Sequence, residues 1–127
     1  MNVDHAGIAT DDADSLVEQY TALFDCSVAH EEAFNEMEIR FLDLGNCYFE
    51  VIEPLGDGAI ASYLDHSGPG IHHLAVETED IEASLDTARG LGIDLIDEQP
   101  RPGAWGHDVA FLHPGSTGGV LFEFVEH

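Results

Sequence analysis

The chain has 127 residues and a formal net charge of −23, because 26 aspartates and glutamates are set against only three cationic side chains. All three cations are arginines, and lysine is absent. This charge excludes electrostatic binding to nucleic acid or to an anionic membrane. Hydrophobic residues make up 44% of the chain, which is enough for a folded core and argues against a disordered acidic tail. The absence of lysine favours a halophilic protein adapted to a high-salt cytoplasm.

The sequence also indicates where the protein works. Its apolar runs are all too short to cross a bilayer, and its first residues lack the basic and apolar segments of a secretion signal. The two cysteines, Cys26 and Cys47, are too few for a disulfide framework and are expected to be reduced thiols. We therefore predict a cytoplasmic protein that forms a single domain over residues 1–127.

The pattern of the first half predicts a strand, a helix and three further strands. In chain order these are a strand at 3–10, a helix from the acidic residues at 11–14 to about Phe24, a strand at 25–32, an acidic loop around 33–36, and a hairpin of 37–44 and 47–53 that turns at Gly45-Asn46. Pro54 ends the last strand, and the connector that follows carries a helical turn at 59–65.

The second half repeats this order. It predicts a strand at 71–78, a helix capped by Asp80 that carries Ile81, Leu85 and Ala88 and ends at Gly90 or Gly92, a strand at 93–97, a loop at 100–106, and strands at 109–113 and 120–125. The plan is βαβββ twice, in an α+β fold, with module one over about 1–55, a connector over 56–69 and module two over 70–127. Because neither half closes a core alone, we expect both to pair into one curved, mixed sheet with the helices outside.

Each half opens with a histidine and closes with a glutamate. His5 and His73 lie in matching apolar segments, and Glu50 and Glu123 lie in the matching segments Phe49–Glu53 and Phe122–Glu126. A lone strand histidine is usually structural, and a lone strand glutamate usually faces solvent, but their repetition in both halves argues against coincidence. The histidines without a counterpart, His30, His66, His107, His113 and His127, are predicted to be surface or loop residues.

The repeated histidines and glutamates predict a metal site. His5 shares its strand face with the small residues Gly7 and Ala9, as suits a cavity. Glu50 and Glu123 each lie between large apolar neighbours, where a buried carboxylate is costly without a metal, a cation or a proton. Two imidazoles and two carboxylates favour a divalent ion such as Co²⁺, Mn²⁺, Zn²⁺, Ni²⁺ or Fe²⁺.

The sequence resembles the vicinal-oxygen-chelate (glyoxalase) superfamily and, within it, the methylmalonyl-CoA epimerase family. The segments that carry the resemblance are 50–55, 70–76, 97–104 and 111–123, and the likeness extends over essentially the whole chain. It implies the glyoxalase/bleomycin-resistance-type fold around a metal cleft. It also implies a homodimer.

The resemblance further implies a site and an activity. One divalent ion per chain, with Co²⁺ as the first candidate, would be held by His5, Glu50, His73 and Glu123. The enzyme would be an isomerase that interconverts (R)- and (S)-methylmalonyl-CoA by metal-assisted transfer of the α-proton. Glu123 and Glu38 would be the catalytic acid/base pair, with Glu36 as the alternative to Glu38.

Three loops are candidates for contacts with substrate, and two other functions are possible for the same fold. The segments 34–37, 102–106 and 114–119 are candidates for ordering over substrate or are ordinary hairpin connections. A glyoxalase I-type lactoylglutathione lyase would use the same classes of metal ligand. A non-catalytic small-molecule-binding protein of the same fold would have little reason to keep two histidines and two glutamates in ligand positions.

Overall fold

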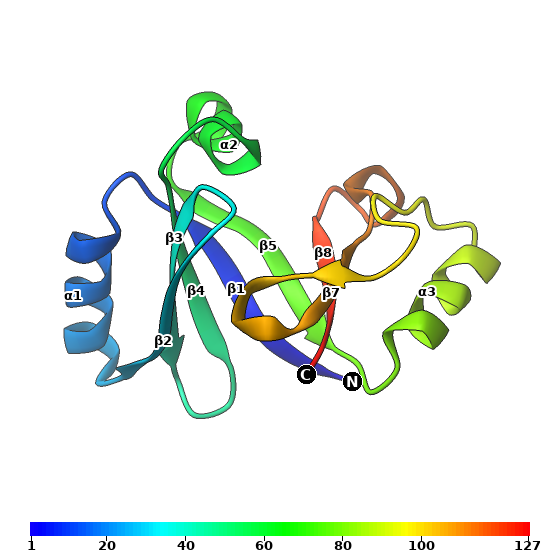
Figure 1. Cartoon of the computed structure of the whole chain (residues 1–127), viewed down its shortest axis with the longest axis horizontal. Coiled ribbons are helices and arrows are strands. Elements are labelled where there is room, and N and C mark those ends of the chain that lie inside the picture. Colours follow the sequence, from blue (N-terminus) through cyan, green and yellow to red (C-terminus); the bar gives the residue numbers. More distant parts are fainter. The chain divides into compact units, whose positions relative to one another are not determined.

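The computed structural model describes residues 1–127. The chain divides into two compact units: the first unit is His5–His72, and the second unit is Met1–Asp4 together with His73–His127. The elements labelled in Figure 1 are β1 (Asn2–Ala9), α1 (Ala13–Phe24), β2 (Ser27–Phe34), β3 (Met37–Asp43), β4 (Tyr48–Pro54), α2 (Ala59–Ser67), β5 (Gly70–Glu77), α3 (Ile81–Gly90), β6 (Arg101–Pro102), β7 (Asp108–Phe111) and β8 (Phe122–Glu126), with short 3-10 turns at Ala104–Gly106 and Pro114–Ser116.

In the first unit, the strands lie in the order β2-β3-β4-β1. The two hairpin pairs are antiparallel, whereas β1 runs parallel to β4. Helix α1 covers one face of this sheet, where Leu42 and Val51 are buried with Ala13 of the helix (Figure 1). The helix begins where predicted, because the Asp12 side chain accepts a hydrogen bond from the backbone N–H of Ser15 at 3.1 Å.

In the second unit, the strands lie in the order β5-β8-β7-β6, with β5 parallel to β8 and the other pairs antiparallel. Helix α3 packs Ile81 and Leu85 against Ala110 and Leu112 of the sheet. Asp80 caps this helix by accepting a hydrogen bond from the backbone N–H of Ala83 at 3.0 Å. The two units therefore repeat the same strand and helix plan, as the sequence predicts.

A second acceptor fixes the start of each helix. Glu53 of β4 accepts a hydrogen bond from the backbone N–H of Ala13 at 2.7 Å, and Glu126 of β8 accepts one from Ile81 at 2.9 Å. A carboxylate at this place satisfies an N–H that has no partner within the helix and lies at the positive end of the helix dipole. The glutamate that ends each repeated strand segment thus ties that strand to its helix.

Two predicted segments differ from the structure. The acidic loop around 33–36 is a tight two-residue turn at Asn35 and Glu36, whose φ values of 48° and 61° allow Phe34 and Met37 to pair directly. The predicted strand at 93–97 makes only one bridge, between Leu95 and Leu112. The second unit's counterpart of β2 is instead the two-residue strand β6.

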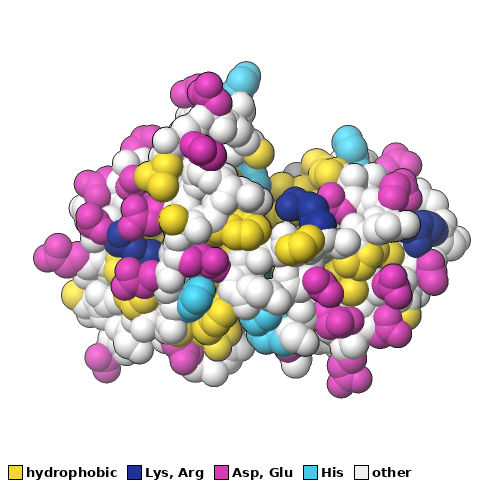
Figure 2. All heavy atoms as spheres, viewed as in Figure 1, with side chains coloured by type: hydrophobic (Ala, Val, Ile, Leu, Met, Phe, Trp, Pro, Cys, Tyr) yellow, Lys and Arg dark blue, Asp and Glu magenta, His cyan; other side chains and the backbone are white.

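The short helices and the acidic surface are those expected from the sequence. No helix in the structure has both the length and the apolar character needed to span a membrane. On the face drawn in Figure 2, carboxylates are scattered over the surface and the arginines form only a few isolated patches.

Candidate metal centre

The first unit holds one histidine–glutamate pair. His5 of β1 lies across from Tyr48, and Gly7 lies across from Glu50, so both candidate ligands project from the same face of the sheet. Their atoms His5 Nε2 and Glu50 Oε1 are 3.3 Å apart, and the two side chains are 5% and 7% exposed. Phe41 of β3 presents its ring at 88° to the imidazole of His5, with 5.4 Å between the ring centroids.

The second unit holds the matching pair. His73 of β5 and Glu123 of β8 approach to 3.5 Å between Nε2 and Oε1, with side chains that are 4% and 8% exposed. Phe111 of β7 lies at 81° to the imidazole of His73, with centroids 5.4 Å apart. The register places Phe111 across from Glu123, as it places Phe41 across from Glu50. The sequence analysis did not identify these two phenylalanines, although their matching positions opposite the glutamates were a usable signal.

The chemistry of each pair fits a divalent metal ion. An imidazole nitrogen and a carboxylate oxygen are ligands of Zn²⁺ and of related first-row ions. The three arginines are paired with other carboxylates: Arg40 with Asp14, Glu31 and Glu38, Arg89 with Asp86 and Glu98, and Arg101 with Asp97. A divalent ion held by these pairs would supply a positive charge that offsets the cost of burying Glu50 and Glu123.

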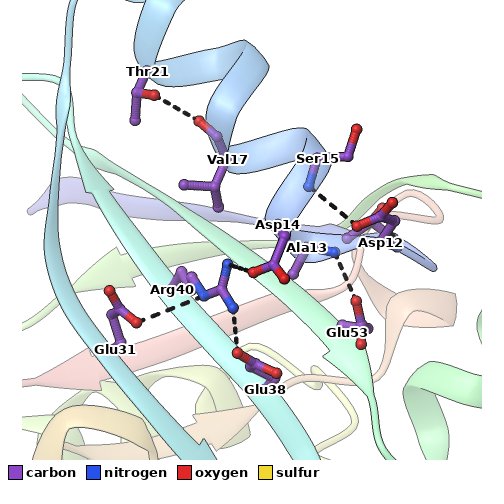
Figure 3. A network of polar contacts seen from close by, with 11 residues as sticks. Asp12, Ala13, Asp14, Ser15, Val17, Thr21, Glu31, Glu38, Arg40 and Glu53 are labelled. Carbon is purple, nitrogen blue, oxygen red and sulfur yellow. Dashed lines mark hydrogen bonds and ion pairs between the residues drawn. The ribbon is translucent and has the colours of Figure 1, made fainter.

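Glu38 lies on the other face of the first unit's sheet. It lies across from Glu53, which caps α1, and its carboxylate accepts a hydrogen bond from Arg40 (Figure 3). Phe41, the neighbour of His5, belongs to the opposite face because side chains alternate along β3. The structure thus places the predicted second base with helix α1 and not beside His5. Glu36, the alternative, is an exposed residue of the β2–β3 turn.

Arg40 accounts for the position of Glu38. Its guanidinium is only 12% exposed and contacts Asp14 of α1 at 2.6 Å, Glu31 of β2 at 3.8 Å and Glu38 (Figure 3). Burial lowers the pKa of Arg40, but the hydrogen bonds and charges of Glu38 and Asp14 outweigh it and raise the pKa above its usual value. This network links α1 to β2 and β3, which is a structural role.

Several of the other histidines make specific contacts. His127 donates a hydrogen bond from Nε2 to the buried carboxylate of Asp4 at 2.6 Å, and its ring stacks on His107 with centroids 4.0 Å apart. His30 does not lie in a loop: it is part of β2 and pairs with Glu32.

Residues 4–111 match the model of the Glyoxalase/Bleomycin resistance protein/Dioxygenase superfamily, so the chain belongs to this superfamily. The uncharacterized protein YqjC of Bacillus subtilis is 32% identical and is matched over 98% of this chain and 91% of its own. The ethylmalonyl-CoA/methylmalonyl-CoA epimerase of Cereibacter sphaeroides is 33% identical over 98% of this chain and 96% of its own.

The solved structures agree with the family. The crystal structure of methylmalonyl-CoA epimerase from Mycobacterium tuberculosis matches with a TM-score of 0.94 and 33% identity, over 98% of this chain and 87% of that one. The predicted α+β fold of the glyoxalase type is therefore confirmed. The resemblance to the methylmalonyl-CoA epimerases that segments 97–104 and 111–123 suggested is confirmed as well.

Proposed function

We propose that the protein is a methylmalonyl-CoA epimerase that interconverts (R)- and (S)-methylmalonyl-CoA. The observation that carries the proposal is the buried histidine–glutamate pair that occurs once in each unit, as His5 with Glu50 and as His73 with Glu123. The Cereibacter and Mycobacterium relatives bear epimerase names, which supports the same class of substrate.

The proposal includes one divalent ion per chain, held by His5, Glu50, His73 and Glu123. Co²⁺ is our first choice, and Mn²⁺, Zn²⁺ and Ni²⁺ suit the same nitrogen and oxygen ligands. A bound ion would supply a Lewis acid that stabilises the negative charge developing on the thioester oxygen of the substrate. The burial of all four side chains keeps water away and so strengthens such electrostatic stabilisation.

Glu123 is the proposed acid/base on one side of the substrate. Its carboxylate accepts the α-proton, so that an O–H bond forms as the C–H bond breaks and the electron pair moves into the thioester as an enolate. Its conjugate acid returns a proton to the same side of the carbon. Inversion therefore requires a second acid/base on the opposite side.

The test is exchange of the α-proton in deuterated water. The protein, loaded in turn with each of the four ions, is given (R)- or (S)-methylmalonyl-CoA, and exchange and epimer content are followed by NMR. We expect exchange and interconversion that a chelator abolishes and added metal restores. The absence of exchange with every ion would refute the proposal. Turnover of a thiol hemithioacetal in its place would identify a glyoxalase I-type lyase.

A further inference from the structure

A second histidine–glutamate pair lies on the same face of the first unit's sheet as His5 and Glu50. In this pair, His30 Nε2 and Glu32 Oε1 of strand β2 are 3.2 Å apart, and the side chains are 29% and 25% exposed. We propose that His30 is the second acid/base of the epimerisation and that Glu32 is its positioning residue. This inference rests on the proposed function.

A β-bulge turns this pair toward the candidate metal ligands. Val28 lies across from Leu42 and packs in the core under α1, but the register of β2 shifts before His30, which lies across from Phe41. Without the bulge, His30 would share the α1 face with Val28, because residues two apart in a strand point the same way. Bulges of this kind re-aim side chains and are frequent next to active sites.

The register then gives the spacing. His30 lies across from Phe41, and Phe41 lies across from Glu50, so the three residues form one row over β2, β3 and β4. Neighbouring strands are about 4.8 Å apart, which puts the backbones of His30 and Glu50 roughly 10 Å apart. The Phe41 ring lies between, 5.4 Å from the His5 ring and 6.3 Å from the His30 ring. His30 and the His5–Glu50 pair therefore lie on the same face of the sheet, on either side of the Phe41 ring.

The chemistry of the pair suits proton transfer. Neutral imidazole accepts a proton and imidazolium donates one near neutral pH, and a hydrogen bond to a carboxylate fixes which ring nitrogen carries the proton. His30 would take the α-proton of one epimer, forming N–H as C–H breaks, while the electron pair moves into the thioester. The proposed acid/base on the other side of the carbon would then return a proton there. The reverse sequence converts the other epimer, so the proton count is conserved in both directions.

The test compares His30→Gln and Glu32→Gln with Glu31→Gln. Glu31 stands between the two proposed residues in the sequence but lies on the opposite face, where it contacts Arg40, and its side chain is 63% exposed. We expect His30→Gln to lower kcat about 100-fold or more, Glu32→Gln to lower it less, and Glu31→Gln to leave it unchanged. Metal content and KM should remain close to wild type in all three variants, because none of these residues is a proposed metal ligand.

Isotope exchange and chemical rescue separate catalysis from structure. His30→Gln should still exchange the α-proton of one epimer through Glu123 but should no longer interconvert the two. In His30→Ala, added imidazole should restore part of the interconversion, which a purely structural role would not produce. Wild-type interconversion in His30→Gln, or loss of metal from a folded His30→Gln protein, would overturn the inference. Failure of the proposed function is distinct, because the wild-type protein itself would then show no exchange.

Discussion

The two units carry the same buried histidine–glutamate pair but differ in the strand at the edge of their half of the sheet. In the first unit this strand is β2, which has eight residues and carries His30 and Glu32. In the second unit it is β6, which has only the two residues Arg101–Pro102. The repeated strands thus carry the candidate metal ligands in both units, whereas the non-repeated strand carries features that only one unit has. Under the proposed function, the repeated strands would supply the metal ligands, and the non-repeated strand β2 would supply the second acid/base.

The edge strand of the second unit carries an arginine, Arg101, near the ring of Phe111. Arg101 lies with its guanidinium carbon 5.5 Å from the centre of the Phe111 ring and bonds Asp97 at 3.0 Å. Phe111 in turn contacts the ring of His73. The Phe111 ring of the second unit thus has a cation beside it, whereas the Phe41 ring of the first unit has His30 beside it.

The largest expected effect is a loss of activity, and its size should distinguish Glu50 from Glu123. Glu50→Gln keeps a ligand oxygen and removes one charge, so we expect a loss of metal affinity of about 10-fold to 100-fold and a comparable loss of activity. Glu123→Gln removes both a ligand charge and the proposed acid/base, so kcat should fall by a further factor of about 100 or more at saturating metal. Steady-state rates and metal titrations of the two variants provide the measurement.

Equal loss of kcat in Glu50→Gln and Glu123→Gln at saturating metal would contradict this division of roles. It would mean that the two units contribute equivalent residues to the reaction. The proposed proton transfer by Glu123 would then be wrong. Metal titration of the variants would still test whether Glu123 is a metal ligand.

The sequence predicted the repeated parts well because two independent copies reinforced each signal. Asp80 was predicted as a helix cap, Asp12 was among several cap candidates, and the four candidate metal ligands were predicted from the same repetition. Some features without a second copy were missed, although the connector helix α2 was predicted. No alternation of polar and apolar residues reveals the bulge that re-aims His30, since a bulge breaks the very period on which strand prediction relies.

The segment 93–97 was misjudged for a physical reason, and the position of Glu38 could not be foreseen. The alternating Ile93 and Leu95 satisfied the strand pattern, but in the structure both pack against the core under α3 without a neighbouring ladder. Asp97 then accepts a hydrogen bond from the backbone N–H of Phe111 at 2.9 Å, so a side chain replaces a strand partner there. The predicted role of Glu38 came from a resemblance of position, and its Arg40 partner on the α1 face was not visible in the sequence.

A second prediction compares the arginines of the two units under changing salt. Arg40 is 12% exposed among three carboxylates, whereas Arg89 is 41% exposed. Arg40→Gln leaves that acidic group without its cation and should lower the free energy of unfolding by about 2 kcal/mol, whereas Arg89→Gln should cost below about 1 kcal/mol. Thermal unfolding at low and at molar KCl provides the measurement.

Salt should reduce the Arg40 effect, because screening weakens the repulsion among the carboxylates left behind. For the wild type, the charge of −23 leads us to expect the thermal midpoint to rise from low to molar KCl. A flat or falling midpoint would contradict the proposed adaptation to high salt. A defect in Arg40→Gln that persists undiminished in molar KCl would point to lost packing of the long side chain as its cause.

The smallest expected effect tests whether the two units are equivalent in stability. Glu53→Gln and Glu126→Gln each weaken a hydrogen bond to the first N–H of a helix, at Ala13 and at Ile81, and remove a negative charge from its positive end. Each should lower the free energy of unfolding by about 1 kcal/mol, comparable to the loss of a helix cap. For a domain of this size that corresponds to a fall of about 4 °C in thermal midpoint. Since the two contacts differ by little in length, 2.7 Å against 2.9 Å, the two variants should match each other, and the double variant should show the sum because the sites share no partner. A loss confined to Glu53→Gln would mean that the strand–helix tie stabilises the first unit alone, and that the repeated glutamate has diverged in role as the edge strands have.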